Sequence, residues 1–309
     1  MKLLKHPRDL GAAGRKVCLA IGMFDGVHLG HQHVIRQTVT DAGQQEGLAV
    51  VVSFDRHPNS VVAPSRLPPL IYSLPQKVRA IESLGVEATW LIHFDLEFSR
   101  QEAGAFVQQL VAEFQNVHSI CVGSDFAFGK QRAGNVELLR RLGGEFRFVV
   151  HGLAAVSLDG RAVSSTRIRE AIMAGRLEMA SEMLGRAYSL AGPVMEGARL
   201  GTQLGFPTAN LDTTGLALPP NGVYAAHASI GSRRHRAAVN IGLRPTIAGG
   251  APAPRVEAHL LDWKGDIYGQ ELELTFVQRL RDERRFDSVD ALREQIQLDV
   301  AATRNCFDN

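Results

Sequence analysis

Two histidines three residues apart are the first side chains in this chain that could do chemistry. His28 and His31 lie in the stretch GMFDGVHLGHQ, after an apolar run and before a helix-like pattern. Gly26 and Gly30 let the backbone turn tightly and approach a ligand closely. A helix that begins near His31 presents N–H groups and a positive dipole end, which bind anionic oxygens. Two imidazole N–H groups aimed at one phosphate would favour a pentavalent phosphorus, so the stretch predicts phosphate chemistry.

Two other interpretations of these histidines compete with this one. A metal site would need a third ligand, and His33 or Asp25 would have to supply it. His33 follows His31 by two residues and therefore leaves a helix on a different face. Alternatively, paired histidines at a turn are simply polar surface. The preceding strand, the two glycines and the following helix favour the phosphate interpretation.

A second stretch, VSSTRIRE at residues 163–170, has groups that suit the same chemistry. Its three hydroxyl side chains precede a helix, and arginines follow them. Arginine adds fixed positive charge for phosphate oxygens. By itself such a stretch is more often only a helix cap. The stretch GSDFAFGKQ is not a phosphate-binding P-loop, because five residues separate its glycines and glutamine follows the lysine.

The third candidate is GTQLGFPTANL at residues 201–211. Gly201 and Gly205 allow the backbone to cradle a phosphate. Thr208 and Asn210 alternate along an extended segment, so both side chains face one side. Hard oxygen ligands of this kind suit Mg²⁺ together with substrate phosphates. The competing interpretation is a turn followed by an edge strand.

Composition narrows the classes of protein that could carry these sites. The chain has 309 residues, ordinary hydrophobic and charged fractions and a formal net charge of +2, which gives no case for binding nucleic acid or an anionic membrane. The three cysteines, Cys18, Cys121 and Cys306, are far apart, so neither a disulfide scaffold nor a zinc site is expected. The N-terminal residues do not resemble a secretory signal, and no apolar stretch is long enough to span a bilayer. We expect a cytoplasmic protein.

The first half of the chain alternates strand-like and helix-like segments. Strands are expected at residues 16–24, 48–54, 88–94, 118–124 and 146–152, and helices at residues 31–45, 74–85, 102–114 and 135–143. Continuous apolar strands separated by helices predict a parallel sheet that is covered on both faces. Such sheets bind ligands at the carboxyl ends of their strands. The predicted class of this half is therefore α/β and Rossmann-like.

From about residue 187 glycine and proline become frequent, and the apolar runs become short. Strands at residues 223–230, 236–241, 256–262 and 272–277 predict a compact antiparallel barrel or sandwich. The last segment, residues 287–305, reads as an amphipathic helix with Asp287 or Ser288 as its cap. Val289, Leu292, Ile296 and Val300 are expected on its buried face.

The first half resembles a known enzyme family. GMFDGVHLGHQ resembles the HxGH signature of the nucleotidyltransferase superfamily, in the form found in the adenylyltransferase half of bacterial bifunctional riboflavin kinase/FAD synthetases. VSSTRIRE is similar to the second signature of that superfamily, ISSTxxR. SFDRHPNSVV and VGSDFAFGKQRAG resemble two further stretches of the family. At Met23 the chain departs from many members, which carry asparagine.

This resemblance implies roles for individual residues. His28 and His31 would be catalytic. ATP and its phosphates would be bound by Gly22, Phe24, Asp25, Gly30, Ser164, Ser165, Thr166 and Arg169. The flavin would be bound by Phe54, His57, Pro58, Asp125, Phe126 and Phe128.

The second half resembles the flavokinase part of the same family. GFPTAN matches its signature, and GVYA, VNIGLRPT and VEAHLLDWKGDIYG follow in the family's order. The resemblance implies a six-stranded Greek-key barrel in which Thr208 and Asn210 hold Mg²⁺-ATP, Gly201 and Gly205 contact phosphate, Glu257 is the catalytic base and Arg281 borders the flavin. Leu200 and Thr202 stand where the family often has arginine.

Together these resemblances imply a bifunctional enzyme. Residues 187–309 would phosphorylate riboflavin with ATP to give FMN, and residues 1–186 would transfer AMP from ATP to FMN to give FAD and pyrophosphate. FMN and FAD would be substrate and product, not redox cofactors. The oligomeric state does not follow from the sequence. Three alternatives are an HxGH enzyme with another acceptor, a flavin carrier with inactive sites and an RNA-binding barrel. The GFPTAN barrel disfavours the first alternative. The retained site residues disfavour the carrier, and the low net charge disfavours RNA binding.

Overall fold

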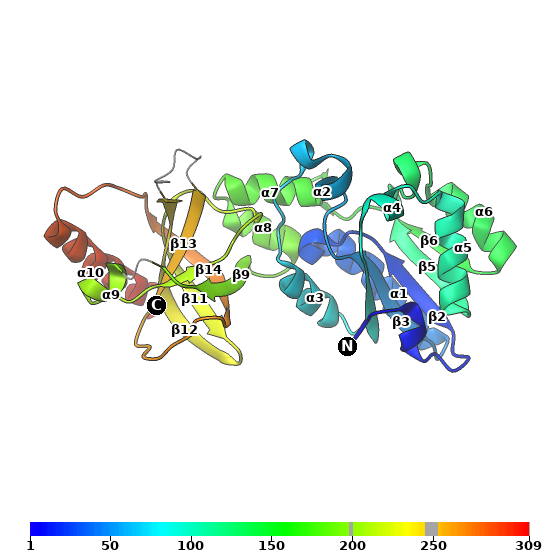
Figure 1. Cartoon of the computed structure of the whole chain (residues 1–309), viewed down its shortest axis with the longest axis horizontal. Coiled ribbons are helices and arrows are strands. Elements are labelled where there is room, and N and C mark those ends of the chain that lie inside the picture. The colour runs from blue at the N-terminus through cyan, green and yellow to red at the C-terminus, as the bar shows by residue number, and fades with distance from the viewer. Residues whose placement is uncertain (198–199, 245–252, 309) are drawn as a thin grey trace. The chain divides into compact units, whose positions relative to one another are not determined.

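The computed structural model describes residues 1–197, 200–244 and 253–308. The chain divides into two compact units, Met1–Arg167 and Ile168–Asn309. Pro245 and Thr246, the last residues of VNIGLRPT, lie outside the described residues. Figure 1 shows the first unit as a helix-covered sheet and the second as a barrel with helices.

The sheet of the first unit has six parallel strands in the order β1-β4-β3-β2-β5-β6. Their bounds are β1 Lys2–Leu4, β2 Val17–Ile21, β3 Leu48–Phe54, β4 Ala88–Ile92, β5 Val117–Gly123 and β6 Val149–Leu153. The parallel sheet predicted from the apolar runs is confirmed. Strand β1 was not expected, because three residues carry too little pattern to predict a strand.

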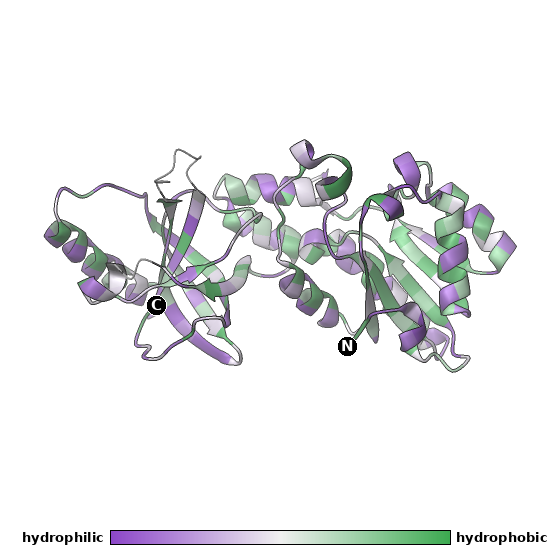
Figure 2. Ribbon diagram, in the orientation of Figure 1, coloured by the Kyte–Doolittle hydropathy of each residue, from purple (hydrophilic) through white to green (hydrophobic). Residues whose placement is uncertain are grey.

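Four long helices cover this sheet: α1 Leu29–Gln44, α3 Leu74–Glu82, α5 Ala103–Phe114 and α6 Val136–Phe146. Successive residues of β2 point to opposite faces, which explains the two cores. Leu19 and Ile21 pack with the apolar stripes of α5 and α6, whereas Cys18 and Ala20 pack with those of α1 and α3. Figure 2 shows the strands as hydrophobic and the helices as mixed, as a sheet buried on both faces requires.

Shorter elements complete the first unit. Single-turn helices are η1 Pro7–Leu10, η2 Asp25–Val27, α2 Asn59–Val62, η3 Pro64–Arg66, α4 Leu96–Ser99 and η4 Lys130–Arg132. Strands β7 Ser157–Leu158 and β8 Arg161–Ala162 form a small hairpin. Helix α7, Ser165–Met173, crosses from the first unit into the second, and α8, Leu177–Leu184, follows it.

The second unit contains a closed antiparallel barrel in the order β10-β13-β12-β11-β14-β9. Its strands are β9 Ser189–Met195, β10 Ala209–Leu211, β11 Gly222–Ile230, β12 Arg233–Arg244, β13 Ala253–Leu260 and β14 Glu271–Arg281. The six-stranded barrel is therefore confirmed. Tyr188, Tyr224 and Phe276 fill its interior, with ring centroids 5.7 and 5.4 Å apart for the two pairs that Phe276 makes.

Two helices accompany the barrel, α9 Leu200–Leu204 and α10 Val289–Asn305. Ser288 caps α10, since its hydroxyl accepts a hydrogen bond from the Ala291 amide at 3.1 Å. The expected buried face is only partly confirmed. Leu292, Ile296 and Val300 are half-buried, but Val289, the first residue of the helix, is 63% exposed. Within the described residues no helix is long and apolar enough to cross a bilayer.

Candidate active sites

The first site lies where β2 ends and α1 begins. His28 is the N-cap of α1, and its Nδ1 accepts a hydrogen bond from the His31 amide at 3.4 Å. The helix therefore starts two residues earlier than predicted. A neutral imidazole that accepts through Nδ1 carries its proton on Nε2, so His28 presents Nε2 as a donor. The ring thus stands at the N-terminus of α1, and the first N–H groups of a helix can bind a phosphate.

The two imidazole rings are stacked on each other. Their centroids are 3.6 Å apart at an interplanar angle of 19°, and the edge of the Phe24 ring meets His31 at 5.2 Å. Gly30 makes room for this stack, because a Cβ there would lie 3.2 Å from a carbon of the His28 ring. Gly22 does the same for Phe24, whose ring would be 2.9 Å from an added Cβ. The predicted glycines therefore shape the position of the histidines.

The contact of Asp25 with ATP stays a prediction, and the structure shows which groups of the protein Asp25 binds. Its side chain is buried, and its carboxylate accepts hydrogen bonds from the amides of Ile71 at 3.0 Å and Tyr72 at 3.3 Å. The Asp25 carbonyl accepts a further bond from the Ser165 hydroxyl at 3.0 Å. This last bond joins the two signatures of the first half, which are 140 residues apart in the chain.

The remaining residues of VSSTRIRE surround the start of α7. Ser164 accepts a hydrogen bond from the Arg167 amide at 3.3 Å, and Thr166 is exposed. The Arg167 guanidinium donates to the carbonyls of Leu158 and Arg161, so it braces the β7–β8 hairpin. Arg169 is half-buried and belongs to the second compact unit.

An aromatic layer connects three of the predicted flavin residues. Phe54 contacts Phe98, which contacts Phe106, which contacts Phe128, with centroids 5.9, 5.8 and 6.0 Å apart. Phe126 stacks on Phe128 at 5.2 Å and 15°. Phe54 and Phe126 are only half-buried, so the two ends of this layer still present surface. Such rings could stack against a flat heteroaromatic ligand.

The other predicted flavin residues lie in loops. His57 Nδ1 accepts a hydrogen bond from the Asn59 amide at 3.0 Å, and its carbonyl accepts one from the Ser60 hydroxyl at 2.8 Å. Pro58 stands at the N-cap position of α2. Asp125 is exposed in the loop after β5. Their contacts with a flavin stay a prediction.

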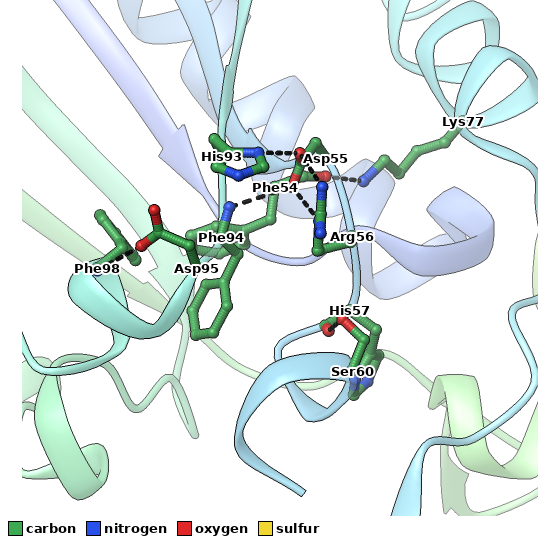
Figure 3. A network of polar contacts seen from close by, with 10 residues as sticks. All are labelled: Phe54, Asp55, Arg56, His57, Ser60, Lys77, His93, Phe94, Asp95 and Phe98. Carbon is green, nitrogen blue, oxygen red and sulfur yellow. Dashed lines mark hydrogen bonds and ion pairs between the residues drawn. The ribbon is translucent and has the colours of Figure 1, made fainter. Parts of the chain in front are cut away.

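Figure 3 shows a polar network at the ends of β3 and β4 that the sequence did not reveal. Asp55 accepts hydrogen bonds from His93 Nδ1 at 2.7 Å and from the Phe94 amide at 3.1 Å, and it pairs with Arg56 at 3.4 Å. Burial raises the pKa of Asp55, but these three partners together lower it below its ordinary value. A carboxylate that stays charged here joins the two strand ends.

The second site is built on the outer face of the barrel. Asn210 is paired with Glu257 across β10 and β13, and Glu257 is paired with Asn240 across β13 and β12. Val256 and Ala258, on either side of Glu257, are fully buried. Because side chains alternate along a strand, the three polar residues form a row on the face opposite the core.

A cavity of about 270 Å³ lies over Glu257 and Asn240, whereas Asn210 is not among the residues that line it. Its polar wall includes Thr208, Asn240 and Glu257, and residues of α10 such as Leu292 and Ile296 form an apolar wall. Binding sites for small molecules commonly combine apolar walls with a few convergent polar groups. The cavity therefore brings the predicted Glu257 and Thr208 together.

The GFPTAN segment is held in place by its own backbone and by β13. The Phe206 amide donates to the Gly201 carbonyl at 2.8 Å, and the Pro207 carbonyl lies 2.8 Å from His259 Nδ1. The backbone at Gly201 packs against Thr208, since an added Cβ would lie 3.2 Å from its hydroxyl oxygen. Gly205 has a φ of +88°, which favours glycine. These contacts fix the Thr208 hydroxyl at the mouth of the cavity.

Three residues of this site were missed in the sequence. Arg255 and His259 flank Glu257 on the same face of β13, and the Arg255 guanidinium forms an ion pair with the Glu257 carboxylate. Asn240 lies opposite Glu257. The i±2 spacing of Arg255 and His259 about Glu257 is the signal that could have found them.

Arg281, expected beside the flavin, lines the cavity and is bound to α10. Its guanidinium makes two hydrogen bonds to the Asp299 carboxylate, at 2.8 and 2.7 Å. Gln295 donates to the same carboxylate at 2.7 Å. This bidentate pair fastens α10 to the end of β14 and so holds one wall of the cavity in place.

We expect Asp299→Ala to lower the free energy of unfolding of the barrel by about 3 kcal/mol, because it leaves the Arg281 charge largely buried without its partner. The matched control is Asp282→Ala, which breaks the exposed pair with Arg279 and should cost less than about 1 kcal/mol. Urea unfolding followed by the fluorescence of Trp263, in a Trp90→Phe background that removes the other tryptophan, measures both. Equal losses in the two variants would contradict this role of the pair.

Comparison with known proteins agrees with the division into two sites. Residues 12–167 match the family model of FAD synthetase, and residues 184–307 match that of riboflavin kinase. The chain is 35% identical to the bifunctional riboflavin kinase/FMN adenylyltransferase of Pseudomonas fluorescens, over 98% of this chain and 97% of that protein. It is 34% identical to the protein of the same name from Haemophilus influenzae, over the full length of both.

Similarity also extends to a solved structure. The crystal structure of a protein described as a macrolide-efflux protein from Streptococcus pneumoniae superimposes with a TM-score of 0.80 at 30% identity, over 98% of both chains. Both compact units therefore share their fold with a solved structure. With both family matches and the full-length relatives, the chain belongs to the family of bifunctional riboflavin kinases/FMN adenylyltransferases.

Proposed function

We propose that the two sites carry the two reactions of this family in sequence. The barrel cavity phosphorylates riboflavin with ATP to give FMN and ADP. The site at His28 and His31 transfers AMP from a second ATP to FMN, which gives FAD and pyrophosphate. The observation that carries this proposal is that one chain holds both sites, so that one makes the substrate of the other.

In the barrel, Glu257 is proposed as the base. The primary hydroxyl of riboflavin attacks the γ-phosphorus of ATP, the bond to the bridging oxygen breaks, and the carboxylate accepts the hydroxyl proton. The position of Glu257 supports this role, because it stands in the cavity wall between two amide side chains. Arg281 and the apolar residues of α10 would then border the flavin.

The oxygen ligands on this face fit Mg²⁺. Thr208 and Asn210 offer a hydroxyl and an amide oxygen on the same side of an extended segment, which suits an ion that also binds phosphate oxygens and water. Gly201 and Gly205 would lie against the phosphates. When bound, the ion would neutralise charge on the ATP phosphates.

In the first unit, His28 and His31 would stabilise negative charge during adenylyl transfer. The FMN phosphate oxygen attacks the α-phosphorus of ATP, and the bond to pyrophosphate breaks, so no covalent enzyme intermediate is needed. Two stacked imidazole rings at the N-terminus of α1 support this role. Ser165 and Thr166 would contact ATP phosphates. We place the reactions in the cytoplasm, which supplies ATP and keeps thiols reduced.

Chromatography of the products formed from riboflavin, ATP and Mg²⁺ tests the proposal. FMN should appear first and FAD should follow at its expense. With FMN in place of riboflavin, FAD and pyrophosphate should form directly. A folded protein that makes neither FMN nor FAD would exclude the proposed function.

A further inference from the structure

Lys77 is a buried lysine on α3 that none of the roles above uses. The residue is only 4% exposed. The ammonium donates to the Phe54 carbonyl at 2.7 Å, to the Ser53 hydroxyl at 3.3 Å and to the Met23 carbonyl at 3.4 Å. Figure 3 shows it reaching the end of β3. One cation therefore contacts the carboxyl ends of both β3 and β2, where ligands of parallel sheets bind.

The loop that Lys77 contacts is the one that carries the histidines. Met23 directly precedes Phe24, whose ring contacts His31. The Ser53 hydroxyl also donates to the Met23 carbonyl, at 3.1 Å. Two donors from neighbouring elements thus meet at the single peptide group that leads from β2 into the loop.

A second contact closes a ring of interactions. The Asp25 carboxylate binds the amides of Ile71 and Tyr72, just before α3 begins. From there α3 brings Lys77 back to the Met23 carbonyl. The loop therefore holds the start of α3, and α3 in turn holds the loop. A change at Lys77 would be transmitted to the histidines through this ring.

The positive charge of Lys77 also matters for the electrostatics of the phosphate site. The charged groups that face the Lys77 ammonium are Asp25 from η2 and Asp55 from the end of β3, the latter paired with Arg56 and His93. Without a cation between them, these carboxylates would repel the phosphates of an anionic substrate. Burying an ammonium costs free energy, so its presence here is not explained by stability alone.

We propose that Lys77 is a positioning residue for adenylyl transfer: it fixes the loop that carries His28 and His31, and its charge offsets Asp25 and Asp55 beside the phosphate site. The inference rests on the proposed function of that site. Lys77 acts through the Met23 peptide group and needs no contact with the reacting atoms.

Titration supplies a readout that a purely structural residue would not show. Burial lowers the pKa of Lys77 from 10.5 to about 8, against the opposing effect of Asp25 and Asp55. The ammonium is therefore charged near neutral pH and loses its proton as the pH rises through about 8. Above that pH the two carboxylates are no longer offset, so FAD formation should fall while riboflavin phosphorylation in the barrel should not follow it.

The test compares wild type, Lys77→Met and Lys77→Arg, with Arg79→Met as a control that removes an exposed charge from the same helix. FMN-to-FAD and riboflavin-to-FMN rates are measured on the same samples from about pH 6 to about pH 10. Lys77→Met should lower FAD formation at least about tenfold near pH 7 and abolish the fall near pH 8. Lys77→Arg should restore most of the rate and move the fall to higher pH, because arginine stays charged. Arg79→Met should match wild type.

Several results would overturn the inference. One is a Lys77→Met variant within about twofold of wild type in FAD formation. Another is a fall near pH 8 that persists unchanged in Lys77→Arg. A third is a Lys77→Met variant that loses both activities and its folded circular dichroism, without rescue by arginine, which would make the residue structural. If wild type itself formed no FAD from FMN, the proposed function would fail instead.

Discussion

Replacing Glu257 by glutamine is expected to lower riboflavin phosphorylation by about 10³-fold, because the amide cannot accept the hydroxyl proton. The change is nearly isosteric, so the row with Asn210 and Asn240 should stay in place. FMN-to-FAD conversion should remain at the wild-type rate, since the two histidines proposed for it, His28 and His31, lie in the other compact unit. Initial rates with riboflavin and with FMN as alternative substrates measure the two effects separately.

Another carboxylate in the cavity wall, that of Glu283, provides a control for this experiment. Glu283 also lines the cavity, where Asn221 donates to it at 3.2 Å. Glu283→Gln should lower the rate less than about tenfold, because this residue lies in a loop outside the polar row. A larger loss in Glu283→Gln than in Glu257→Gln would reassign the base.

Removing the two histidines is expected to have the opposite effect on the two activities. His28→Ala combined with His31→Ala should lower FMN-to-FAD conversion by about 10³-fold or more, since each imidazole donor is worth about 10²-fold and the pair shares one task. Riboflavin phosphorylation should persist, so FMN should accumulate. Product chromatography with riboflavin as the starting substrate shows this directly.

His28 needs a control, because it also caps α1. Alanine at this position removes the acceptor for the His31 amide and costs about 1 kcal/mol of stability. Asparagine is a favourable N-cap, so His28→Asn keeps the helix start and removes only the imidazole. FAD formation should be lost in His28→Asn at an unchanged thermal midpoint. An active His28→Asn would show that the ring matters as a cap and not as a phosphate donor.

The sheet could be predicted because its signals are local. Each central strand is a continuous apolar run followed by a helical pattern, and β2 is buried at every position. The paired histidines could be found for the same reason, since a strand end, two glycines and a helix start are adjacent in the chain. Strand β1 could not be found, because its three residues gain their identity only from pairing with β4.

The contacts of individual side chains were harder to predict than the helices and strands. The place of Asp25 beside ATP stays a prediction, and the sequence did not indicate that its carboxylate binds amides 46 and 47 residues later in the chain. The place of Arg281 beside the flavin likewise stays a prediction, and the sequence did not indicate its bond to Asp299 on α10. Lys77 lies in a helix whose sequence reads as ordinary and amphipathic. Such contacts depend on tertiary packing, which leaves no periodic signal in one sequence.

The alternation along β13 has a consequence for how this enzyme can vary. Val256 and Ala258 fill the interior, while Arg255, Glu257 and His259 line the cavity. Because the two sets are interleaved one residue apart, inserting or deleting a single residue in this strand would exchange them. Glu257 would then point into the apolar interior, and a valine or alanine would face the cavity. This part of the gene should therefore accept codon replacements far more readily than changes of length, which the loops between strands can absorb.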